Sequence, residues 1–201
     1  MEFLSTVDEL EALYGAPGTP SLRKVARQMT PLYRQWIMAS RLCMLATVGP
    51  EGTDDSPRGD DGPVVLELDP GTLALPDWRG NNRIDSLRNI LRDPRVSLMF
   101  LVPGSNNVVR VNGRARVTAD AAMLARFDKN GKQPRTVIVI EIGEIYSQCA
   151  RALMRARTWT SGDESAGLPS MGEILAEQTA GQEGGIAYDE AWAPRAAKTL
   201  W

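Results

Sequence analysis

The chain has 201 residues, of which 43% are hydrophobic and 24% are charged, and its formal net charge is -2. These values are typical of one globular domain with a single core, and they exclude a disordered chain. The negative net charge gives no sign of a nucleic-acid-binding surface. No apolar run approaches the roughly 20 residues that span a bilayer, and the acidic, amphipathic start is unlike a secretory signal. We therefore expect a cytoplasmic protein with no membrane or nucleic-acid partner.

The residue types that are missing limit the chemistry. The chain has no histidine, so it cannot contain a Ser-His-Asp triad, a Cys-His pair or an HExxH zinc site. Its two cysteines, Cys43 and Cys149, lie far apart and form no CxxC pair, which argues against a disulfide framework and a cysteine zinc site. We expect no metal site, and if the protein is an enzyme, a bound cofactor supplies the difficult chemistry.

The first forty residues have helical signals. Thr6 to Glu9 match a capping box, and Gly15 is placed to end the helix that follows. Thr19-Pro20 and Thr30-Pro31 each put a capping hydroxyl before a proline at the first helical position. The pattern predicts an N-terminal helical extension over residues 1–40.

Six strand candidates come next, and most are joined by turns. They are residues 42–48, 64–68, 72–75, 96–102, 108–118 and 136–145. In the fifth, Val109 and Val111 face one way while Arg110 and Asn112 face the other. Strand follows strand without regular crossover helices, which favours a small antiparallel barrel over a parallel sheet. The predicted class is α+β, mainly β.

Further helices are expected near residues 82–91, 120–127, 149–157 and 170–177. One domain should span residues 1–180. Residues 181–201 lose periodicity, so they are predicted to be a C-terminal tail. Because Trp192, Leu200 and Trp201 are costly to leave in water, part of this tail is expected to pack on a subunit.

Gly80 to Leu91 (GNNRIDSLRNIL) is the first candidate binding segment. With Asn82 as N-cap, the free amides of the first helical turn face outward, and an anion fits there. Arg83 adds a charged fork, Ser86 adds a hydroxyl donor, and Gly80 lets the backbone come close. The alternative is an ordinary capped helix with a solvated arginine.

Two other clusters are candidates. Residues 54–62 form a polar segment that has the composition of a turn, but Arg58 lies between a proline and a glycine and could fold against the entrance of the predicted helix. Residues 148–159 carry Arg151 and Arg155 one helical turn apart, followed by Trp159. This basic segment could contact a ligand or a nucleic-acid backbone, or it could be a surface helix with a core tryptophan.

Together these segments resemble the pyridoxamine 5'-phosphate oxidase-like FMN-binding proteins of the split-barrel superfamily. The resemblance is closest to the bacterial FMN-dependent branch with an N-terminal helical extension. It runs in register from about residue 8 to residue 178 and rests on the segments Asp8–Gly15, Ser21–Val25, Leu45–Gly59, Leu75–Gly104, Arg110–Thr118 and Cys149–Trp159.

The resemblance implies a six-stranded antiparallel split β-barrel and a homodimer with two FMN molecules at its interface. It also implies cofactor-binding residues in two groups. The flavin phosphate would be held by Arg58, Gly59, Asn81, Asn82, Arg83 and Ser86. The partner subunit would cover the ring, with Arg110, Gln148, Arg151 and Trp159 as candidates. No catalytic residue is assigned, because the isoalloxazine ring itself accepts hydride or single electrons.

The function expected from this resemblance is that of an FMN-dependent oxidoreductase acting on a small organic substrate, with a reduced nicotinamide as a candidate electron donor. A deazaflavin-dependent reductase and a non-catalytic flavin-binding protein are the alternatives, and a heme-handling protein is a weaker one. Pyridoxamine phosphate oxidases proper hold the phosphate of their substrate with further basic and histidine residues. Since this chain has no histidine, we do not expect it to oxidise vitamin B6.

Overall fold

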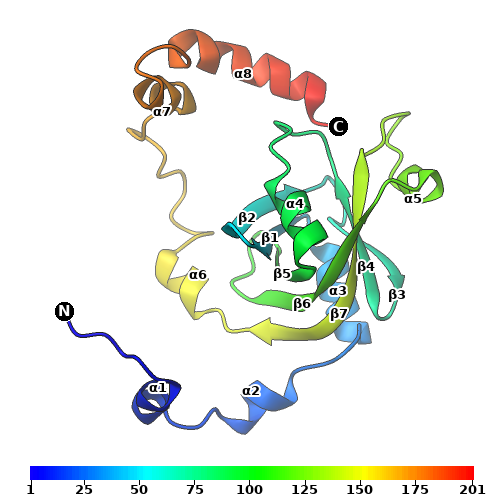
Figure 1. Ribbon diagram of the computed structural model, residues 1–201, viewed down its shortest axis with the longest axis vertical. Coiled ribbons are helices and arrows are strands. Elements are labelled where there is room, and N and C mark those ends of the chain that lie inside the picture. Colours follow the sequence, from blue (N-terminus) through cyan, green and yellow to red (C-terminus); the bar gives the residue numbers. More distant parts are fainter.

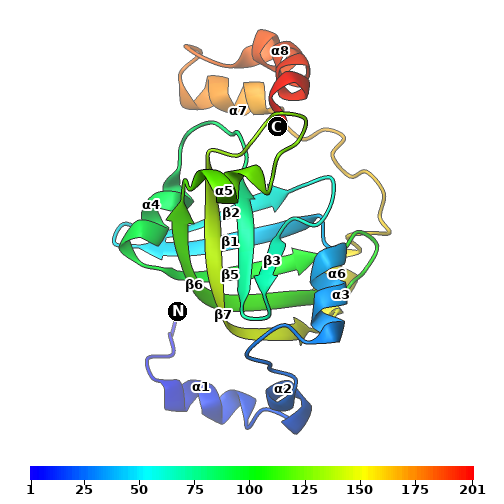
Figure 2. The same ribbon diagram turned by 90° about the vertical axis from the view of Figure 1, so that its right-hand side faces the viewer.

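The centre of the protein is one antiparallel sheet of seven strands, in the order β2-β1-β5-β6-β7-β4-β3. The computed structural model describes residues 1–201, and it shows the sheet curled around a core (Figures 1 and 2). The strands are β1 (Leu42–Gly49), β2 (Gly52–Gly59), β3 (Leu66–Asp69), β4 (Thr72–Asp77), β5 (Arg95–Leu101), β6 (Val108–Thr118) and β7 (Thr136–Gln148). The α+β, split β-barrel class expected from the sequence is confirmed.

Eight helices surround the sheet. They are α1 (Val7–Tyr14), α2 (Thr19–Arg23), α3 (Pro31–Ala39), α4 (Asp85–Arg92), α5 (Ala121–Ala125), α6 (Arg151–Ala156), α7 (Met171–Gln178) and α8 (Gly185–Thr199). Helices α1 and α2 extend from one side of the barrel, and α7 and α8 lie at the opposite side (Figures 1 and 2). No helix of the chain has both the length and the apolar character needed to cross a membrane.

Strand β2 is the seventh strand, and it corrects the prediction of a polar turn at residues 54–62. It pairs with β1 along its whole length, from Leu42 opposite Gly59 to Gly49 opposite Gly52. Because β2 is an edge strand, Pro57 is tolerated there although it cannot donate a backbone hydrogen bond. The turn prediction was wrong because it weighed the polarity of the segment and not the alternation of its side chains.

The core lies inside the curl of the sheet. Phe100, Leu98, Val111, Ile138 and Ile140 are fully buried, and they come from the adjacent strands β5, β6 and β7. The alternation predicted for residues 108–118 is confirmed, because Val109, Val111 and Ala115 are buried and Val117 is half-buried, while the arginines of β6 are partly or fully exposed. Residues from the 54–59 part of β2 and residues 75–77 of β4 line a polar cavity beside this core.

Strand β7 contains a bulge at Gly143, because Asn112 pairs with Glu144 and the next residue, Gly113, pairs with Ile142. The bulge lies opposite Asn112 and Gly113 of β6. A Cβ atom on Gly113 would lie 2.1 Å from the carbonyl oxygen of Glu141, so no other residue fits there without a shift of the backbone.

The N-terminal helices form largely where the sequence places them. The capping box of Thr6 and Glu9, the end of α1 at Gly15 and the cap of α3 by Thr30 are confirmed. The N-cap of α2 is Gly18, so Thr19 is the first helical residue and not the predicted cap. Neither α1 nor α2 has a buried residue, whereas α3 packs Ile37 into the core.

The C-terminal segment differs most from the prediction. The helix expected at residues 170–177 is confirmed as α7, capped by Ser170, but residues 185–199 form a second helix, α8, and not an irregular tail. The backbone amide of Gly172 donates to Asp189 over 2.8 Å, which joins the two helices. Pro194 inside α8 weakens the helical signal of this segment, because proline removes one backbone donor.

Candidate anion-binding cavity

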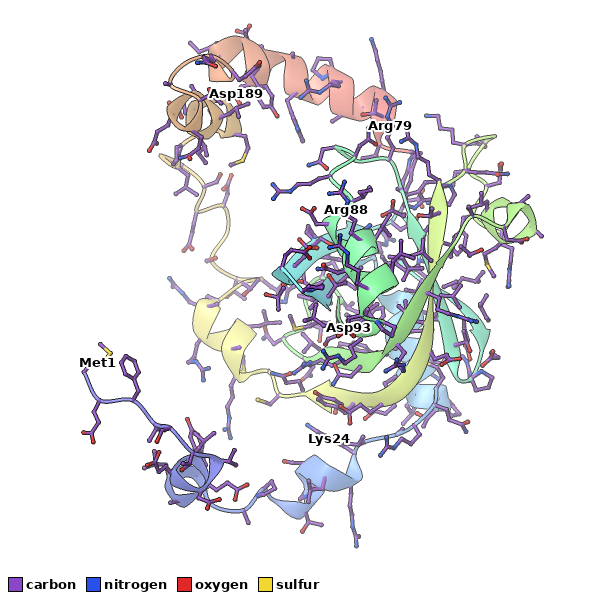
Figure 3. All side chains as sticks on the ribbon, in the orientation of Figure 1. Met1, Lys24, Arg79, Arg88, Asp93 and Asp189 are labelled. Carbon is purple, nitrogen blue, oxygen red and sulfur yellow. The ribbon has the colours of Figure 1, made fainter.

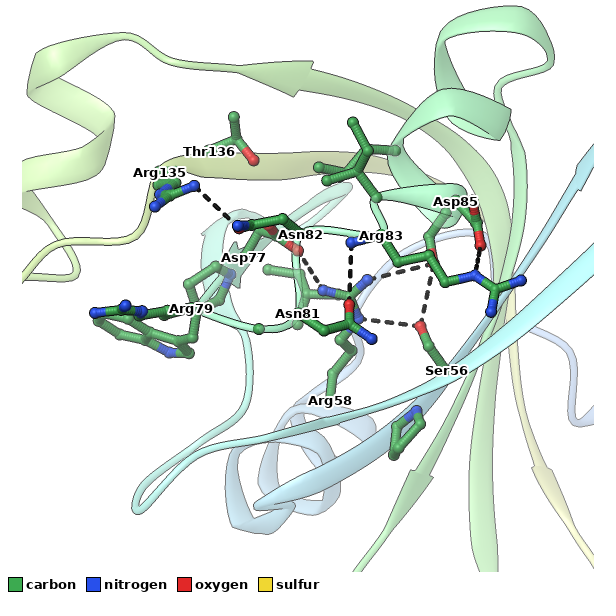
Figure 4. A pocket seen from close by; sticks show the side chains of 18 of the residues that line it. Ser56, Arg58, Asp77, Arg79, Asn81, Asn82, Arg83, Asp85, Arg135 and Thr136 are labelled. Carbon is green, nitrogen blue, oxygen red and sulfur yellow. Dashed lines mark hydrogen bonds and ion pairs between the residues drawn. The ribbon is translucent and has the colours of Figure 1, made fainter. Parts of the chain in front are cut away.

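A cavity of about 760 Å³ opens beside the start of α4. Its walls are β2, the end of β4, the loop from Trp78 to Ile84 and the start of β7 (Figure 4). Leu200, beyond α8, also lines it. Most of its lining is polar, and it includes four arginines: Arg58, Arg79, Arg83 and Arg135. The cavity therefore has the residue types that bind an anion.

Strand β2 supplies one wall through alternate residues. Asp54, Ser56 and Arg58 are half-buried and line the cavity, while Asp55 and the other residues between them are exposed. Each inward residue lies opposite a buried residue of β1, and Arg58 is paired with Cys43. The spacing of two residues directs all three polar side chains to the same face of the sheet.

These side chains form a connected group at the bottom of the cavity. The Nε of Arg58 donates to the Oγ of Ser56 over 3.2 Å, and its Nη2 donates to the Oγ of Ser86 over 3.3 Å. Its Nη1 forms an ion pair with Asp77, while Ser86 donates to Asp54 over 2.5 Å. We call these five residues the floor. One guanidinium faces two carboxylates here, so the floor carries no excess positive charge.

The loop before α4 and Arg135, which directly precedes β7, form the opposite side of the cavity. We call this side the rim: Arg79, Asn81, Asn82, Arg83 and Arg135. The Nη1 of Arg135 donates to the Oδ1 of Asn82 over 3.1 Å, and the backbone amide of Arg83 donates to the Oδ1 of Asn81 over 3.0 Å (Figure 4). Arg79 and Arg135 form no ion pair with a carboxylate. The rim therefore carries the excess positive charge of the cavity.

Arg83 has one carboxylate within reach. Its Nε donates to Asp85 over 2.5 Å, but 81% of its side chain is exposed. An ion pair in such a position is screened by water and is easily exchanged for another anion.

The start of α4 corrects the predicted cap. The N-cap residue is Ile84 and not Asn82, and no side chain caps the helix. Asn82 and Ile84 both have left-handed backbone conformations, with φ of 62° and 51°. Asparagine adopts this conformation readily, whereas a β-branched isoleucine is strained in it. The first amides of α4 consequently have no side-chain acceptor from this chain.

Thr136 has a hydroxyl without a partner. Its Oγ1 is buried and forms no hydrogen bond, and the residue lines the cavity at the start of β7. Buried polar groups in native proteins are almost always paired, so this hydroxyl is an unsatisfied donor in the wall of the cavity.

Cys43 lies next to the floor, but it does not supply a nucleophile. Burial raises the pKa of its thiol to about 12, although the nearby charge of Arg58 acts in the opposite direction. The thiol therefore stays protonated near neutral pH, and thiolate chemistry at the floor is excluded.

The ten predicted cofactor-binding residues fall into two places. Six of them line the cavity: Arg58, Gly59, Asn81, Asn82, Arg83 and Ser86. The other four, Arg110, Gln148, Arg151 and Trp159, are not part of its lining. Arg110 donates to Gln148 over 3.4 Å, and the indole nitrogen of Trp159 donates to the carbonyl of Ser105 over 2.8 Å. The binding role of all ten residues stays a prediction.

Other residues of the cavity were not predicted. They include Asp54, Asp77, Arg79, Arg135, Thr136 and Leu200. The alternation of Asp54, Ser56 and Arg58 is a signal that could have identified β2 and with it Asp54. Thr136 and Leu200 meet the rim only through tertiary structure, and no local pattern indicates them.

A family model described as pyridoxamine 5'-phosphate oxidase matches residues 29–149. The match covers more than half of the chain, from just before α3 to just after β7, and thus includes the whole barrel. It leaves out α1, α2, α6, α7 and α8. No curated protein matches the chain.

Solved structures with a similar barrel include HupZ of Group A Streptococcus. It is 21% identical to this chain, with a TM-score of 0.48 over 59% of this chain and 93% of that chain. General stress protein 26 of Bacillus anthracis is 18% identical, with a TM-score of 0.43 over 57% of this chain and 88% of that chain. Likenesses at this level carry no assignment of activity.

Proposed function

Because the chain belongs to the pyridoxamine 5'-phosphate oxidase family, we propose that it is an FMN-dependent oxidoreductase acting on a small organic substrate, with the flavin phosphate in the cavity between β2 and α4. The observation that carries the proposal is the combination of a preorganised floor with a rim on which Arg79 and Arg135 have no carboxylate partner and Arg83 has only an exposed one. This arrangement favours a ligand with a concentrated negative charge.

The residues of the cavity fit a phosphate monoester. Its volume of about 760 Å³ lies within the range of small-molecule sites. Arginine forks bind phosphate oxygens through two parallel hydrogen bonds, and three of them line the rim. The unpaired hydroxyl of Thr136 and the uncapped start of α4 offer further donors to the same anion.

The floor and the rim would have different tasks. The hydroxyls of Ser56 and Ser86 are held in place by Arg58 and Asp54. Each hydroxyl has one proton, and Ser86 gives its proton to Asp54, so Ser86 would have to release Asp54 before it donates to a phosphate. Arg83 would exchange its exposed contact with Asp85 for the phosphate. When bound, the flavin would supply the redox chemistry by accepting hydride or single electrons. The chain would need to hold the flavin and shape the space above it, and no acid or base is assigned.

A homodimer would explain the four predicted residues outside the cavity. The residues Arg110, Gln148, Arg151 and Trp159 do not line the cavity of their own chain. We propose that they approach the flavin ring from a second copy of the chain, with one FMN in each of two shared sites. Dilution to monomers should then release the flavin, and a monomer that retains it would contradict the shared site.

The proposal is tested by adding FMN to the purified protein. Binding is measured by quenching of flavin fluorescence, and turnover by oxidation of a reduced nicotinamide with a panel of small organic acceptors. Tight binding followed by turnover supports the proposal. Bound FMN that no donor reduces would indicate a flavin-binding protein without catalysis. Binding and reduction of a deazaflavin in place of FMN would indicate a deazaflavin-dependent reductase.

A further inference from the structure

The end of α8 returns to the cavity. Residues 185–199 form the helix, and Leu200, the residue after it, lines the same cavity as the rim. Figure 3 shows Arg79 of the rim beside the end of α8. A segment outside the family match therefore contributes to the wall of the candidate binding site.

Five side chains hold this segment in place. The rings of Trp78 and Trp201 meet edge to face, with centroids 5.1 Å apart and an angle of 78° between the planes. The Nζ of Lys129 lies 3.7 Å from the centroid of the Trp201 ring and forms ion pairs with Asp60 and Asp61. The indole nitrogen of Trp78 donates to Asp60 over 2.9 Å. We call these five residues the latch.

The charge of the latch is stable near neutral pH. Burial lowers the pKa of Lys129, but its hydrogen bonds with Asp60 and Asp61 and the charges of these carboxylates outweigh burial, so its pKa is raised overall. Lys129 thus remains a cation beside two indole rings, which is a favourable cation–π arrangement. The latch connects β2, β4 and β7 of the barrel, through the loops next to them, with the end of α8.

Few other contacts keep α8 at this position. Helix α8 has no buried residue, and Gly172 is the only buried residue of α7. The two helices are joined to each other by Asp189, which accepts from the hydroxyl of Ser170 and from the amide of Gly172. The two helices are thus joined to each other, and the latch ties the end of α8 to the barrel.

We propose that Leu200 and Trp201 form a retaining wall for the ligand of the cavity, and that the latch controls how fast a bound phosphate monoester leaves. The identity of this ligand as FMN rests on the proposed function. The role of the latch rests on the contacts of Trp78, Lys129 and Trp201.

The test compares the dissociation rate of FMN from the full-length wild type, Lys129→Met and Trp201→Ala, followed by the return of flavin fluorescence after rapid dilution. Loss of a cation–π contact of this kind should accelerate release about tenfold. Trp192→Ala is the control for loss of an indole away from the latch, since Trp192 does not line the cavity. Lys132→Met is the control for loss of a lysine charge next to the latch, since Lys132 lies beside Lys129 and Trp201 but forms no cation–π contact with Trp201. Unchanged release from both latch variants, with unchanged melting temperatures, would overturn the proposal.

A second measurement separates failure of the latch from failure of the proposed function. Amide hydrogen exchange of residues 185–201 is recorded with and without inorganic phosphate, so it requires no FMN. Faster exchange in Lys129→Met than in Lys132→Met, with slower exchange on adding phosphate to the wild type, supports the retaining wall. Equal exchange in the two variants overturns it. If Lys129→Met exchanges faster than Lys132→Met, and phosphate slows exchange in the wild type, but the wild type does not bind FMN, the proposed function alone is contradicted.

Discussion

Arg58 on the floor of the cavity and Arg83 on its rim border the same space, but their surroundings differ. The side chain of Arg58 is 18% exposed and contacts Asp77 and two serine hydroxyls. The side chain of Arg83 is 81% exposed and contacts Asp85 alone. Burial and pairing fix the first arginine as part of the fold, whereas the second is free to change its partner.

This difference separates stability from binding. A guanidinium that neutralises a half-buried carboxylate stabilises the folded chain with or without a ligand. A solvated guanidinium contributes little to the stability of the fold, but it can form charge-assisted hydrogen bonds with an anion that enters the cavity. Substitutions in the two places should consequently have separable effects on the free energy of unfolding and on ligand affinity.

The largest effect is expected for Arg58→Ala. The substitution leaves Asp77 half-buried without a cation, and it should lower the free energy of unfolding by about 2 kcal/mol. It also removes the group that orients Ser56 and Ser86, so FMN binding should weaken in the same variant. Urea denaturation measures the first effect and flavin titration measures the second.

A double variant tests whether the two effects of Arg58 have different origins. In Arg58→Met with Asp77→Asn, the unpaired charge is gone, so much of the lost stability should return while FMN binding stays weak. If stability and binding recover together, the floor does not contribute to binding through Arg58.

A smaller effect, confined to binding, is expected for Arg83→Ala. Loss of one charge-assisted hydrogen bond should weaken FMN binding by roughly 1.5 to 3 kcal/mol. Because the side chain is exposed, the free energy of unfolding should change by less than about 0.5 kcal/mol. Arg88→Ala is the matched control, since Arg88 also faces Asp85 but does not line the cavity. Equal affinity of the two variants would remove Arg83 from the site.

The rim is the part of the cavity that could be predicted from the sequence. Gly80 to Leu91 combines special backbone residues, an arginine and the start of an apolar helical stripe within twelve positions, so local chemistry indicates an anion site. Even there the predicted N-cap of α4 was wrong, since the cap is Ile84 and not Asn82. The side chain of Asn82 instead accepts a hydrogen bond from Arg135, a residue 53 positions away that no local pattern indicates.

The floor depends on contacts between segments that are distant in the chain. Asp54 and Ser86 are 32 positions apart, and Arg58 and Asp77 are 19 apart. Their pairing follows from the antiparallel register of β2 with β1 and the packing of α4 on both. The order of the strand candidates predicted an antiparallel barrel, but it did not indicate that an acidic, proline-containing segment would form an edge strand. Helix α8 was missed for a similar reason, since its position depends on Trp78 and Lys129.

Thr136→Val should produce effects of opposite sign on folding and binding. Replacing the unpaired buried hydroxyl by a methyl group removes a desolvation penalty, so the free energy of unfolding should rise by up to about 1 kcal/mol. If the hydroxyl donates to a ligand, FMN affinity should fall by a similar amount. Thr136→Ser keeps the hydroxyl and is the control. A variant that gains stability and binds FMN normally would show that the hydroxyl does not face the ligand.

The smallest effect concerns Cys43, which lies opposite Arg58 in the β1–β2 ladder and reports on whether the floor stays closed. Its pKa in the folded chain is raised by burial from 9.0 to about 12, so between these values the unfolded chain loses its proton first. The contribution of this thiol to the free energy of unfolding is complete below pH 9 and is lost as the pH rises towards 12. Near pH 8, a thiol reagent should modify the exposed Cys149 rapidly and Cys43 only as fast as the barrel opens. Reaction of both thiols at the same rate would mean that the floor opens without unfolding, and the separation between a fixed floor and an adaptable rim would not hold.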